Sequence, residues 1–405
     1  MKIAFYIHHS NLKAGGIFTY SIGVLKLIIN TPEIEKVYVI HSENQKAYLE
    51  DHIGNEKVKF VEIKREGTWR KLRLSISYFL FDLYSIYKEY SQSWMLNFLK
   101  RISLRLNPYH KISKLPVQLL HVPMQFAPVY NVNKPVITTL HDVQELHLPE
   151  NFSAAERLHR AINTKKAIDN STHIIASFEH IKSDILKFFH VNADFVSVCA
   201  PAFHENWFGT TKRTDGATLR KKYELPDLFL LYPASTWIHK NHMNLILAVN
   251  ELHQKGIKCS LVCTGNKTSY YEDILKPKID ELKLNEYISF LGIVSEEDLN
   301  ALYKATSLVV IPTKYEAGSA PLYEAMRMEV PVICANTTSL PETMNNQDFI
   351  FDPDNVSSLA MLIESGLNDQ DFIKRNLENS KNRMESFSKV NYADAFIKCY
   401  ESLLQ

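Results

Sequence analysis

The sequence predicts an α/β protein of two domains, each built on a parallel β-sheet that helices cover. Short runs of β-branched or aromatic residues alternate with longer amphipathic segments along all 405 residues, which is the pattern of parallel strands joined by helical crossovers. The strand-like runs form two similar sets, one in each half of the chain. The length suits two domains of roughly 200 residues each better than one core.

The first half contains seven predicted strands, at residues 3–7, 37–41, 58–63, 117–121, 136–140, 173–177 and 195–198. The second half contains six, at residues 228–232, 260–264, 288–291, 308–311, 332–335 and 349–351. We place the linker at residues 199–203, where proline interrupts regular structure. Residues 391–400 have apolar side chains at helical spacing and predict a terminal helix.

Composition argues against several classes of protein. The 46 basic and 45 acidic residues give a formal net charge of +1, so the molecule as a whole is not strongly attracted to nucleic acid. The 5 scattered cysteines favour a reduced, cytoplasmic protein over a disulfide framework. Residues 1–9 resemble a first strand and loop rather than a signal peptide. No apolar run reaches the roughly 20 residues that cross a bilayer.

Residues 68–114, which we call the basic-aromatic segment, are rich in basic and aromatic side chains and contain only Asp82 and Glu89 as acids. One interpretation is a pair of ordinary helices on the first sheet, with their basic residues in solvent. The other is contact with an anionic membrane, where aromatic side chains enter the headgroup boundary and each Lys or Arg adds about 1 kcal/mol. Binding to single-stranded nucleic acid has no accompanying recognition motif.

The most informative stretch runs from residue 308 to residue 326. A buried apolar strand ends at Pro312, a loop with Gly318 follows, and Pro321 stands where a helix would begin, because a first helical turn does not need the missing N–H. In parallel α/β sheets the carboxyl end of such a strand faces the ligand, and free amides at a helix start suit a phosphate. The stretch therefore predicts a site for a phosphate-bearing ligand.

Two carboxylates belong to this stretch. Glu316 lies in the loop and Glu324 about one turn into the predicted helix, so both side chains can reach the same ligand. A carboxylate repels phosphate but accepts strong hydrogen bonds from sugar hydroxyls. The alternative is that Glu324 only complements the helix dipole and Glu316 is a solvated loop acid.

Other candidate residues follow strands elsewhere in the chain. Lys240 comes after the first strand of the second half, where its ammonium group would stabilise a leaving diphosphate. The alternative is a surface lysine. His141 follows the predicted strand 136–140, and the pair Gly15-Gly16 follows the first strand, where glycine lets the backbone approach a ligand closely. The alternatives are that His141 has only a structural role and that Gly15-Gly16 forms a plain turn.

These residues resemble the signature of a known family. Glu316 and Glu324 stand in the sequence Tyr-Glu-Ala-Gly-Ser-Ala-Pro-Leu-Tyr-Glu-Ala-Met, which is similar to the E-x7-E motif of the retaining glycosyltransferases of family 4. That family has the GT-B fold, two Rossmann-like parallel-sheet domains facing a central cleft. Further similar pieces occur in the family's order: Gly15-Gly16, His141-Asp142, Lys240-Asn241, Gly292-Ile293-Val294 and Ser339-Leu340-Pro341-Glu342.

The resemblance implies a role for each matching residue. The catalytic set would be His141 beside the donor sugar, Lys240 at the diphosphate and Glu316 at the transferred sugar. The donor-binding set would be Gly15, Gly16, Gly265, Ile293, Gly318, Ser319, Ala320, Leu322 and Glu324, with Glu324 at the ribose. Many members have an arginine five residues before the lysine, and this chain has Ser235 there, so the phosphate would have one charged partner fewer.

The resemblance also implies a domain arrangement and a reaction. Residues 1–203 would bind the acceptor, with the terminal helix 389–405 packed back on them, and residues 204–388 would bind the donor. A hexose would pass from a UDP- or GDP-linked donor to a glycan or lipid-linked glycan, with retention, in cell-surface polysaccharide synthesis. No cofactor and no metal are expected. Asp352-Pro353-Asp354 is predicted to form a turn rather than a metal site, and no cluster of His, Cys, Asp and Glu has the spacing of a zinc site.

Three other functions are alternatives to glycosyl transfer. A non-catalytic nucleotide-sugar binding protein would keep Glu324 but would not need His141 or Glu316. A nicotinamide-dependent oxidoreductase is disfavoured because the G-x-G-x-x-G fingerprint is absent after the first strand. A glycan phosphorylase would need a pyridoxal-binding lysine, which we do not identify. We expect a cytoplasmic protein, at the inner face of the membrane if the basic-aromatic segment meets lipid, and no nucleic-acid partner.

Overall fold

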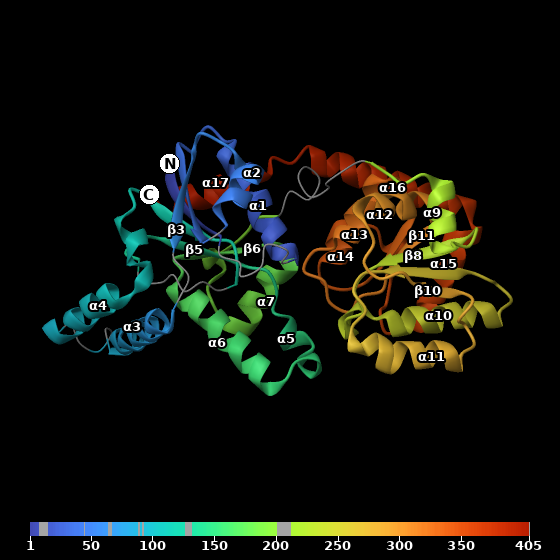
Figure 1. The fold of residues 1–405 in the computed structure, drawn as a ribbon, viewed down its shortest axis with the longest axis horizontal. Helices are drawn as coiled ribbons and strands as arrows, with labels where there is room; N and C mark the ends of the chain where they lie inside the picture. The colour runs from blue at the N-terminus through green and yellow to red at the C-terminus, as the bar shows by residue number, and fades with distance from the viewer. Residues whose placement is uncertain are drawn as a thin grey trace. The chain divides into compact units, whose positions relative to one another are not determined.

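The computed structural model describes residues 1–7, 15–43, 45–63, 67–87, 90, 93–125, 132–200 and 212–404. The chain divides into two compact units (Figure 1). The first unit comprises Met1–Asp142, Ala154–Ala202 and Asn391–Gln405, and the second comprises Val143–Ser153 and Phe203–Val390. The boundary predicted between residues 203 and 204, and residues 201–203 of the predicted linker, lie outside the described residues.

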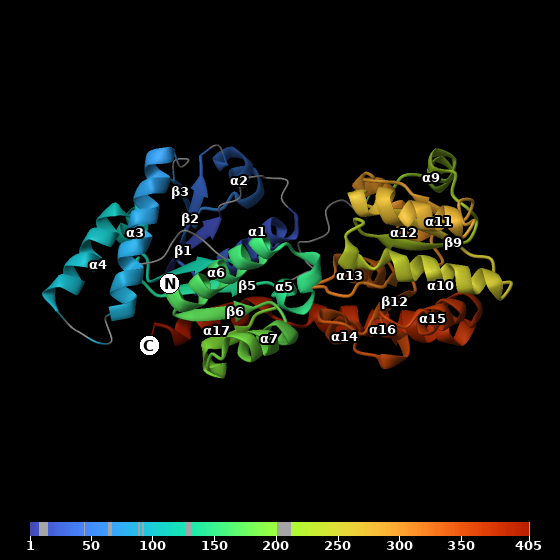
Figure 2. The same ribbon diagram turned by 90° about the horizontal axis from the view of Figure 1, so that it is seen from below.

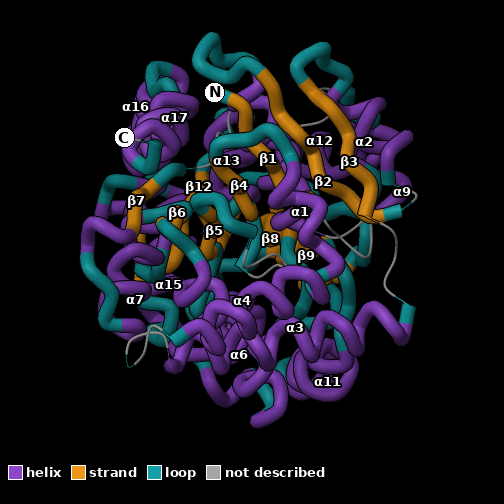
Figure 3. Tube along the Cα trace, turned by 90° about the vertical axis from the view of Figure 1, so that its left-hand side faces the viewer, coloured by secondary structure: helices purple, strands orange, loops and turns teal. Residues whose placement is uncertain are grey.

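The first unit is built on a seven-stranded parallel sheet in the order β3-β2-β1-β4-β5-β6-β7. Figure 3 shows this order across the sheet. The strands are β1 (Lys2–Ile7), β2 (Lys36–Ser42), β3 (Val58–Ile63), β4 (Leu119–Val122), β5 (Val136–Leu140), β6 (His173–Ala176) and β7 (Val196–Val198). Central strands such as β1 and β5 are buried along almost their whole length because helices cover both faces of the sheet.

The helices of the first unit are α1 (Gly15–Ile29), α2 (Lys46–Ile53), α3 (Thr68–Tyr87), α4 (Trp94–Leu106), η1 (Pro108–Lys114), α6 (Ala154–Asn170), α7 (Glu179–Phe189), η3 (Ala193–Phe195) and α17 (Tyr392–Ser402). Helices α3 and α4 lie side by side in Figures 1 and 2. Ser77 and Ser103 join them, because the hydroxyl of each residue donates to the carbonyl of the other at a distance of 2.8 Å.

The terminal helix α17 packs on the first unit although it follows the whole second unit in sequence. His121 Nδ1 of β4 lies 2.7 Å from the hydroxyl of Tyr400 on α17, and His121 Nε2 lies 3.0 Å from Thr139 Oγ1 of β5. All three side chains are buried. The helix is therefore fixed to the middle of the sheet.

The second unit has a six-stranded parallel sheet in the order β10-β9-β8-β11-β12-β13. Its strands are β8 (Phe229–Pro233), β9 (Ser260–Thr264), β10 (Ile288–Phe290), β11 (Leu308–Ile311), β12 (Val332–Ala335) and β13 (Ile350–Phe351). The chain runs outward from β8 to β10, returns to pair β11 with β8, and continues to the other edge. The direction reverses between β8 and β11, and ligands of such sheets bind beyond the carboxyl ends of the strands at this point.

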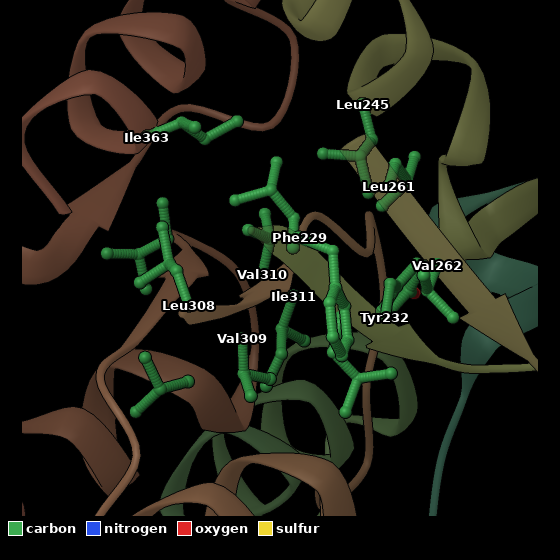
Figure 4. Packing of buried hydrophobic residues seen from close by; sticks show 14 of the residues in the cluster. Phe229, Tyr232, Leu245, Leu261, Val262, Leu308, Val309, Val310, Ile311 and Ile363 are labelled. Carbon is green, nitrogen blue, oxygen red and sulfur yellow. The ribbon is translucent and has the colours of Figure 1, made fainter. Parts of the chain in front are cut away.

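The helices of the second unit are α5 (Gln144–His147), η2 (Pro149–Asn151), α9 (Gly216–Tyr223), η4 (Ile238–Lys240), α10 (His242–Gln254), η5 (Tyr271–Leu275), α11 (Lys276–Glu281), α12 (Glu296–Ala305), α13 (Ala320–Arg327), α14 (Ser339–Met344), η6 (Gln347–Phe349), α15 (Val356–Asn368) and α16 (Gln370–Ser388). Figure 4 shows side chains of β8, β9 and β11 packed together with Leu245 of α10 and Ile363 of α15. This buried cluster holds the strand ends in place.

The predicted two-sheet α/β architecture is confirmed, and each run predicted as a strand forms one. The largest shift is in β4, which begins at Leu119 rather than at Val117. The amide of Val117 instead donates to the carbonyl of Leu115 in a turn. Val143–Ser153, from the first half of the chain, groups with the second unit, and no residue pattern in this segment indicates that grouping.

Candidate functional site

Lys240 ends the short helix η4, in the loop that follows β8. Its carbonyl accepts a hydrogen bond from Tyr232 at 2.9 Å. The carbonyl of His239 accepts from the amide of Lys314 at 2.8 Å, and Asn241 Nδ2 donates to the carbonyl of Pro312 at 2.9 Å. The loop after β8 is therefore tied to the loop after β11, which carries Glu316.

These two loops bring Lys240 and Glu316 into contact. Lys240 Nζ lies 2.6 Å from Glu316 Oε2, and their side chains are 19% and 16% exposed. Both line a cavity of about 290 Å³, together with Ser235, Trp237 and Ser319. The arrangement places one cation and one carboxylate, both largely withdrawn from water, at the topological switch point of the sheet.

The backbone of Glu316 is held by Thr338, which precedes α14, and by Ser339, the first residue of α14. The amide of Glu316 donates to Thr338 Oγ1 at 2.9 Å, and Thr338 Oγ1 donates back to the Glu316 carbonyl at 2.7 Å. Ser339 Oγ donates to the same carbonyl at 3.0 Å. Thr338 has φ +47°, which is unfavourable for a β-branched residue and typical of strained functional positions. Sequence reasoning missed Thr338.

The loop from Gly318 leads into α13. Gly318 has φ +138°, a conformation that favours glycine. Ser319 is the N-cap of α13, but its side chain makes no capping hydrogen bond, and its buried Oγ has no partner among the described residues. A buried hydroxyl without a partner costs free energy, so Ser319 is suited to a ligand that enters the cavity. The helix itself begins at Ala320.

Leu322 contributes differently from the neighbouring predicted residues. Its amide donates to the carbonyl of Ser319 over 3.2 Å. Its side chain is fully buried in the core of the second unit. Leu322 thus anchors the first turn of α13, whereas Ser319 lines the cavity.

Glu324 lies further along α13 and does not line this cavity. One carboxylate oxygen accepts a hydrogen bond from Tyr303 of α12. Burial raises the pKa of Glu324, and the hydrogen bond from Tyr303 opposes that rise. Burial also raises the pKa of Tyr303 well above its ordinary value, so the phenol stays a donor. Sequence reasoning also missed Tyr303, since a lone tyrosine on an amphipathic helix predicts packing.

The loops after β8, β9 and β10 are joined near Gly265 and Ile293, two of the predicted donor-binding residues. The amide of Gly265 donates to the carbonyl of Gly292 at 2.8 Å. Ser235 Oγ accepts from the amide of Asn266 at 3.1 Å. Ser235, which stands where many members of the resembled family have an arginine, therefore holds the neighbouring loop. Ile293 is 81% exposed beside Gly292.

His141 lies in the first unit, directly after β5. Its Nε2 lies 3.1 Å from the carbonyl of Pro123, and its Nδ1 lies 3.3 Å from Ser177 Oγ. A carbonyl can only accept, so Nε2 carries the hydrogen and Nδ1 accepts from the Ser177 hydroxyl. Burial lowers the pKa of His141, which keeps the imidazole neutral. Its ring also packs edge-on against Tyr20.

The glycine pair of the first unit lies at the start of α1, which begins at Gly15. A Cβ on Gly16 would meet no atom of the described residues within 4 Å, so packing against this part of the chain does not require glycine there.

Asp352 and Asp354 form the predicted turn. Asp352 Oδ1 accepts from the amide of Asp354 at 2.9 Å, and Asp354 pairs with Lys314 at 2.5 Å. Within the described ranges, no group of three or more His, Cys, Asp or Glu residues could hold a metal ion. In the same part of the chain, no helix is long and apolar enough to span a membrane.

Comparison with known proteins gives consistent matches. Residues 217–383 match the family model described as glycosyl transferases group 1. The chain is 24% identical to O-antigen chain mannosyltransferase B of Escherichia coli over 406 residues, which cover 100% of both chains. It is 26% identical to the serotype-specific mannosyltransferase WbdA of Escherichia coli over 69% of this chain and 35% of that protein.

Solved structures match over nearly the whole chain. Anabaena Alr3699/HepE in complex with UDP and glucose has a TM-score of 0.67 at 18% identity, and the match covers 99% of this chain and 100% of that one. WaaG, a glycosyltransferase involved in lipopolysaccharide biosynthesis, has a TM-score of 0.61 at 12% identity and 99% coverage of each chain. The GT-B fold that the resemblance implied is therefore confirmed.

Proposed function

We propose that this chain, a glycosyltransferase with the GT-B fold, transfers mannose with retention and without a metal from a nucleoside diphosphate sugar to a glycan. The observation that carries the proposal is the contact between Lys240 and Glu316 in a cavity that Ser319 also lines. Mannose and a role in cell-surface polysaccharide synthesis are supported by the names of the relatives, which are O-antigen and serotype-specific mannosyltransferases.

The donor would occupy the second unit. Lys240 would neutralise the diphosphate, and Ser319, with the amides from Gly318 to Ala320, would donate to phosphate or sugar oxygens. Glu324 would accept from the ribose hydroxyls. The base, uracil or guanine, would lie near Gly265 and the exposed Ile293. The HepE complexes with UDP and UDP-glucose concern that protein, and they support a donor of this chemical class.

The chemistry would rest on charge stabilisation and positioning. As the bond from the sugar to the diphosphate breaks, negative charge grows on the leaving oxygen, and the ammonium group of Lys240 stabilises it. The leaving diphosphate would take the proton of the acceptor hydroxyl, which attacks from the same face. Glu316 would hold Lys240 in place before the donor binds and contact the transferred sugar afterwards. His141, as a neutral imidazole, would act through hydrogen bonds.

The acceptor would bind the first unit, and the basic-aromatic segment would meet an anionic membrane at the inner face. Exposed apolar side chains gather on α3 and α4, including Trp69, Phe79, Trp94 and Phe98. Basic residues accompany them, as at a headgroup boundary. Sedimentation with phosphatidylglycerol vesicles tests this contact: wild type should bind, a variant neutralised at Arg70, Lys71 and Arg73 should bind less, and absence of binding by both proteins contradicts it.

Incubation of the purified protein with UDP-, GDP- and ADP-linked sugars tests the activity. We expect slow hydrolysis of one donor, and faster consumption when a mannose-containing oligosaccharide is added. Nuclear magnetic resonance of the product should give the same anomeric configuration as the donor. Binding of a nucleotide sugar with no turnover under any condition would instead identify a non-catalytic binding protein. Inversion at the anomeric carbon would contradict the mechanism.

A further inference from the structure

A second cavity lies in the first unit, between α4 and η1, and has a volume of about 590 Å³. Lys100 and Arg101 of α4 line it, together with His110, Ser113 and Lys114 of η1. We call it the basic cavity. Within the described part of the chain, no acidic side chain is among its lining residues, so a bound anion would meet no opposing carboxylate from these residues.

Helix α4 presents three different strips along its length. Leu96 and Ser103 are buried, and Ser103 bonds to Ser77 of α3. The residues that α4 contributes to the basic cavity, Asn97, Lys100, Arg101 and Leu104, have i, i+3, i+4, i+7 spacing and therefore share one face. Trp94 and Phe98 are 79% and 53% exposed, and their helical positions place them on the strip beside that face.

Two polar atoms at the basic cavity lack a partner. His110 Nδ1 and Ser113 Oγ are both buried from solvent and make no hydrogen bond within the described part of the chain. Each such atom costs free energy unless a ligand or water bonds to it. A phosphate group offers several acceptor oxygens, and it can bond to a hydroxyl, an imidazole N–H and basic side chains at the same time.

We propose that the basic cavity binds the diphosphate of a membrane lipid carrier that bears the acceptor glycan. This inference rests on the proposed function, because it assumes that the acceptor is a glycan. It assigns the binding site of the acceptor's lipid anchor to residues remote in sequence from Lys240 and Glu316. The exposed aromatic strip of α4 would lie among lipid headgroups, which is the depth at which a carrier presents its diphosphate. Lys100, Arg101 and Lys114 supply the positive charge, and Ser113 and His110 supply short-range hydrogen bonds.

The test compares a cavity variant with a matched control. The cavity variant carries Lys100→Gln, Arg101→Gln and Lys114→Gln. The control carries Arg157→Gln, Lys187→Gln and Lys398→Gln, which remove the same charge from exposed positions of the first unit outside the cavity. Both are assayed with one glycan in two forms: attached to a lipid diphosphate in phosphatidylcholine vesicles, and free of any carrier.

We expect the cavity variant to raise KM for the lipid-linked acceptor by roughly tenfold or more, since hydrogen bonds to charged groups are strong. Its KM for the donor and its transfer to the carrier-free glycan should match those of the control. Equal losses with both acceptors, or no loss with either, would overturn the assignment. Unchanged melting temperatures exclude a folding defect as the cause of any loss.

Titration of the wild type with inorganic diphosphate, followed by the imidazole signals of its histidines, tests the site without turnover. We expect the His110 signals to shift in the wild type and in the control but not in the cavity variant. Sedimentation shows whether the phosphate recognised belongs to a lipid headgroup or to the carrier. It compares phosphatidylglycerol vesicles with phosphatidylcholine vesicles that contain the lipid diphosphate. Equal binding to the two kinds of vesicle contradicts a carrier-specific site. If wild type transfers no sugar but the titration succeeds, the proposed function fails while the anion site stands.

Discussion

Lys240 and Glu316 lie 76 residues apart in sequence, yet their charged groups are 2.6 Å apart. The contact follows from the topology, because β8 and β11 are neighbours in the sheet and each residue stands in the loop after its strand. The ion pair fixes the orientation of the lysine side chain. A diphosphate would therefore meet a cation that is already in position.

Tyr303 should set the acidic limit of donor binding. Removing its hydroxyl by Tyr303→Phe takes away the hydrogen bond that lowers the pKa of Glu324, while burial continues to raise that pKa. The carboxylate would then become protonated, and lose its ability to accept from ribose, at a higher pH. We expect the acidic limb of kcat/KM for the donor to move to higher pH. Tyr323→Phe, on the same helix α13, is the control and should leave the profile in place.

Thr338 should act as a positioning residue for Glu316. Thr338→Val keeps the branched shape but removes the hydroxyl that bonds both the amide and the carbonyl of Glu316. We expect kcat to fall roughly tenfold, as for a lost buried hydrogen bond pair. Thr338→Ser retains the hydroxyl and should restore most of the rate. Equal rates in the two variants, at similar melting temperatures, would show that the hydroxyl does not position Glu316.

Gly265 should tolerate no side chain. It has φ +107°, and a Cβ there would lie 2.6 Å from the amide nitrogen of Ser235. Gly265→Ala should therefore lower the free energy of unfolding by about 2 kcal/mol or more, measured by urea denaturation, and weaken nucleotide binding. Gly23→Ala is the contrasting variant, because its Cβ would meet nothing within 4 Å in the middle of α1. It should leave stability unchanged or raise it.

His121 should make the attachment of α17 sensitive to acid. Burial lowers its pKa from 6.5 to about 3, with a smaller contribution from His141. Between these values the unfolded chain binds a proton that the folded chain does not, so the free energy of unfolding falls as the pH falls below 6.5. Its contribution to the slope is about 1.4 kcal/mol per pH unit. His121→Asn should lose this part of the slope; an unchanged slope contradicts a neutral buried His121.

The fold was predictable because its signal is repeated along the chain. Continuous apolar runs such as residues 308–311 form strands buried on both faces, and turn residues separate them from amphipathic helices. The same logic led to the loop after β11, since Pro312, Gly318 and Pro321 mark a strand end, a turn and a helix start. The first residue of β4 was not predictable, because Val117 and Leu119 are equally apolar and only pairing with β1 decides the register.

The partners within the candidate site were not predictable, because they come from other elements. Thr338 reaches Glu316 through the arrangement of β11 and β12, and Tyr303 reaches Glu324 through the packing of α12 on α13. Neither residue type carries a local signal for such a contact. The basic-aromatic segment showed its composition in the sequence, but only the structure places Lys100, Arg101 and Lys114 around one cavity.

The most direct test of the central claim is the rate of sugar transfer by Lys240→Ala compared with that of Lys314→Ala. Lys240 follows β8 and Lys314 follows β11, but Lys314 pairs with the exposed Asp354 and does not line the cavity. We predict that Lys240→Ala lowers kcat by about a hundredfold or more and weakens binding of the nucleoside diphosphate, while Lys314→Ala retains the wild-type rate. Wild-type kcat and affinity in Lys240→Ala would contradict the account.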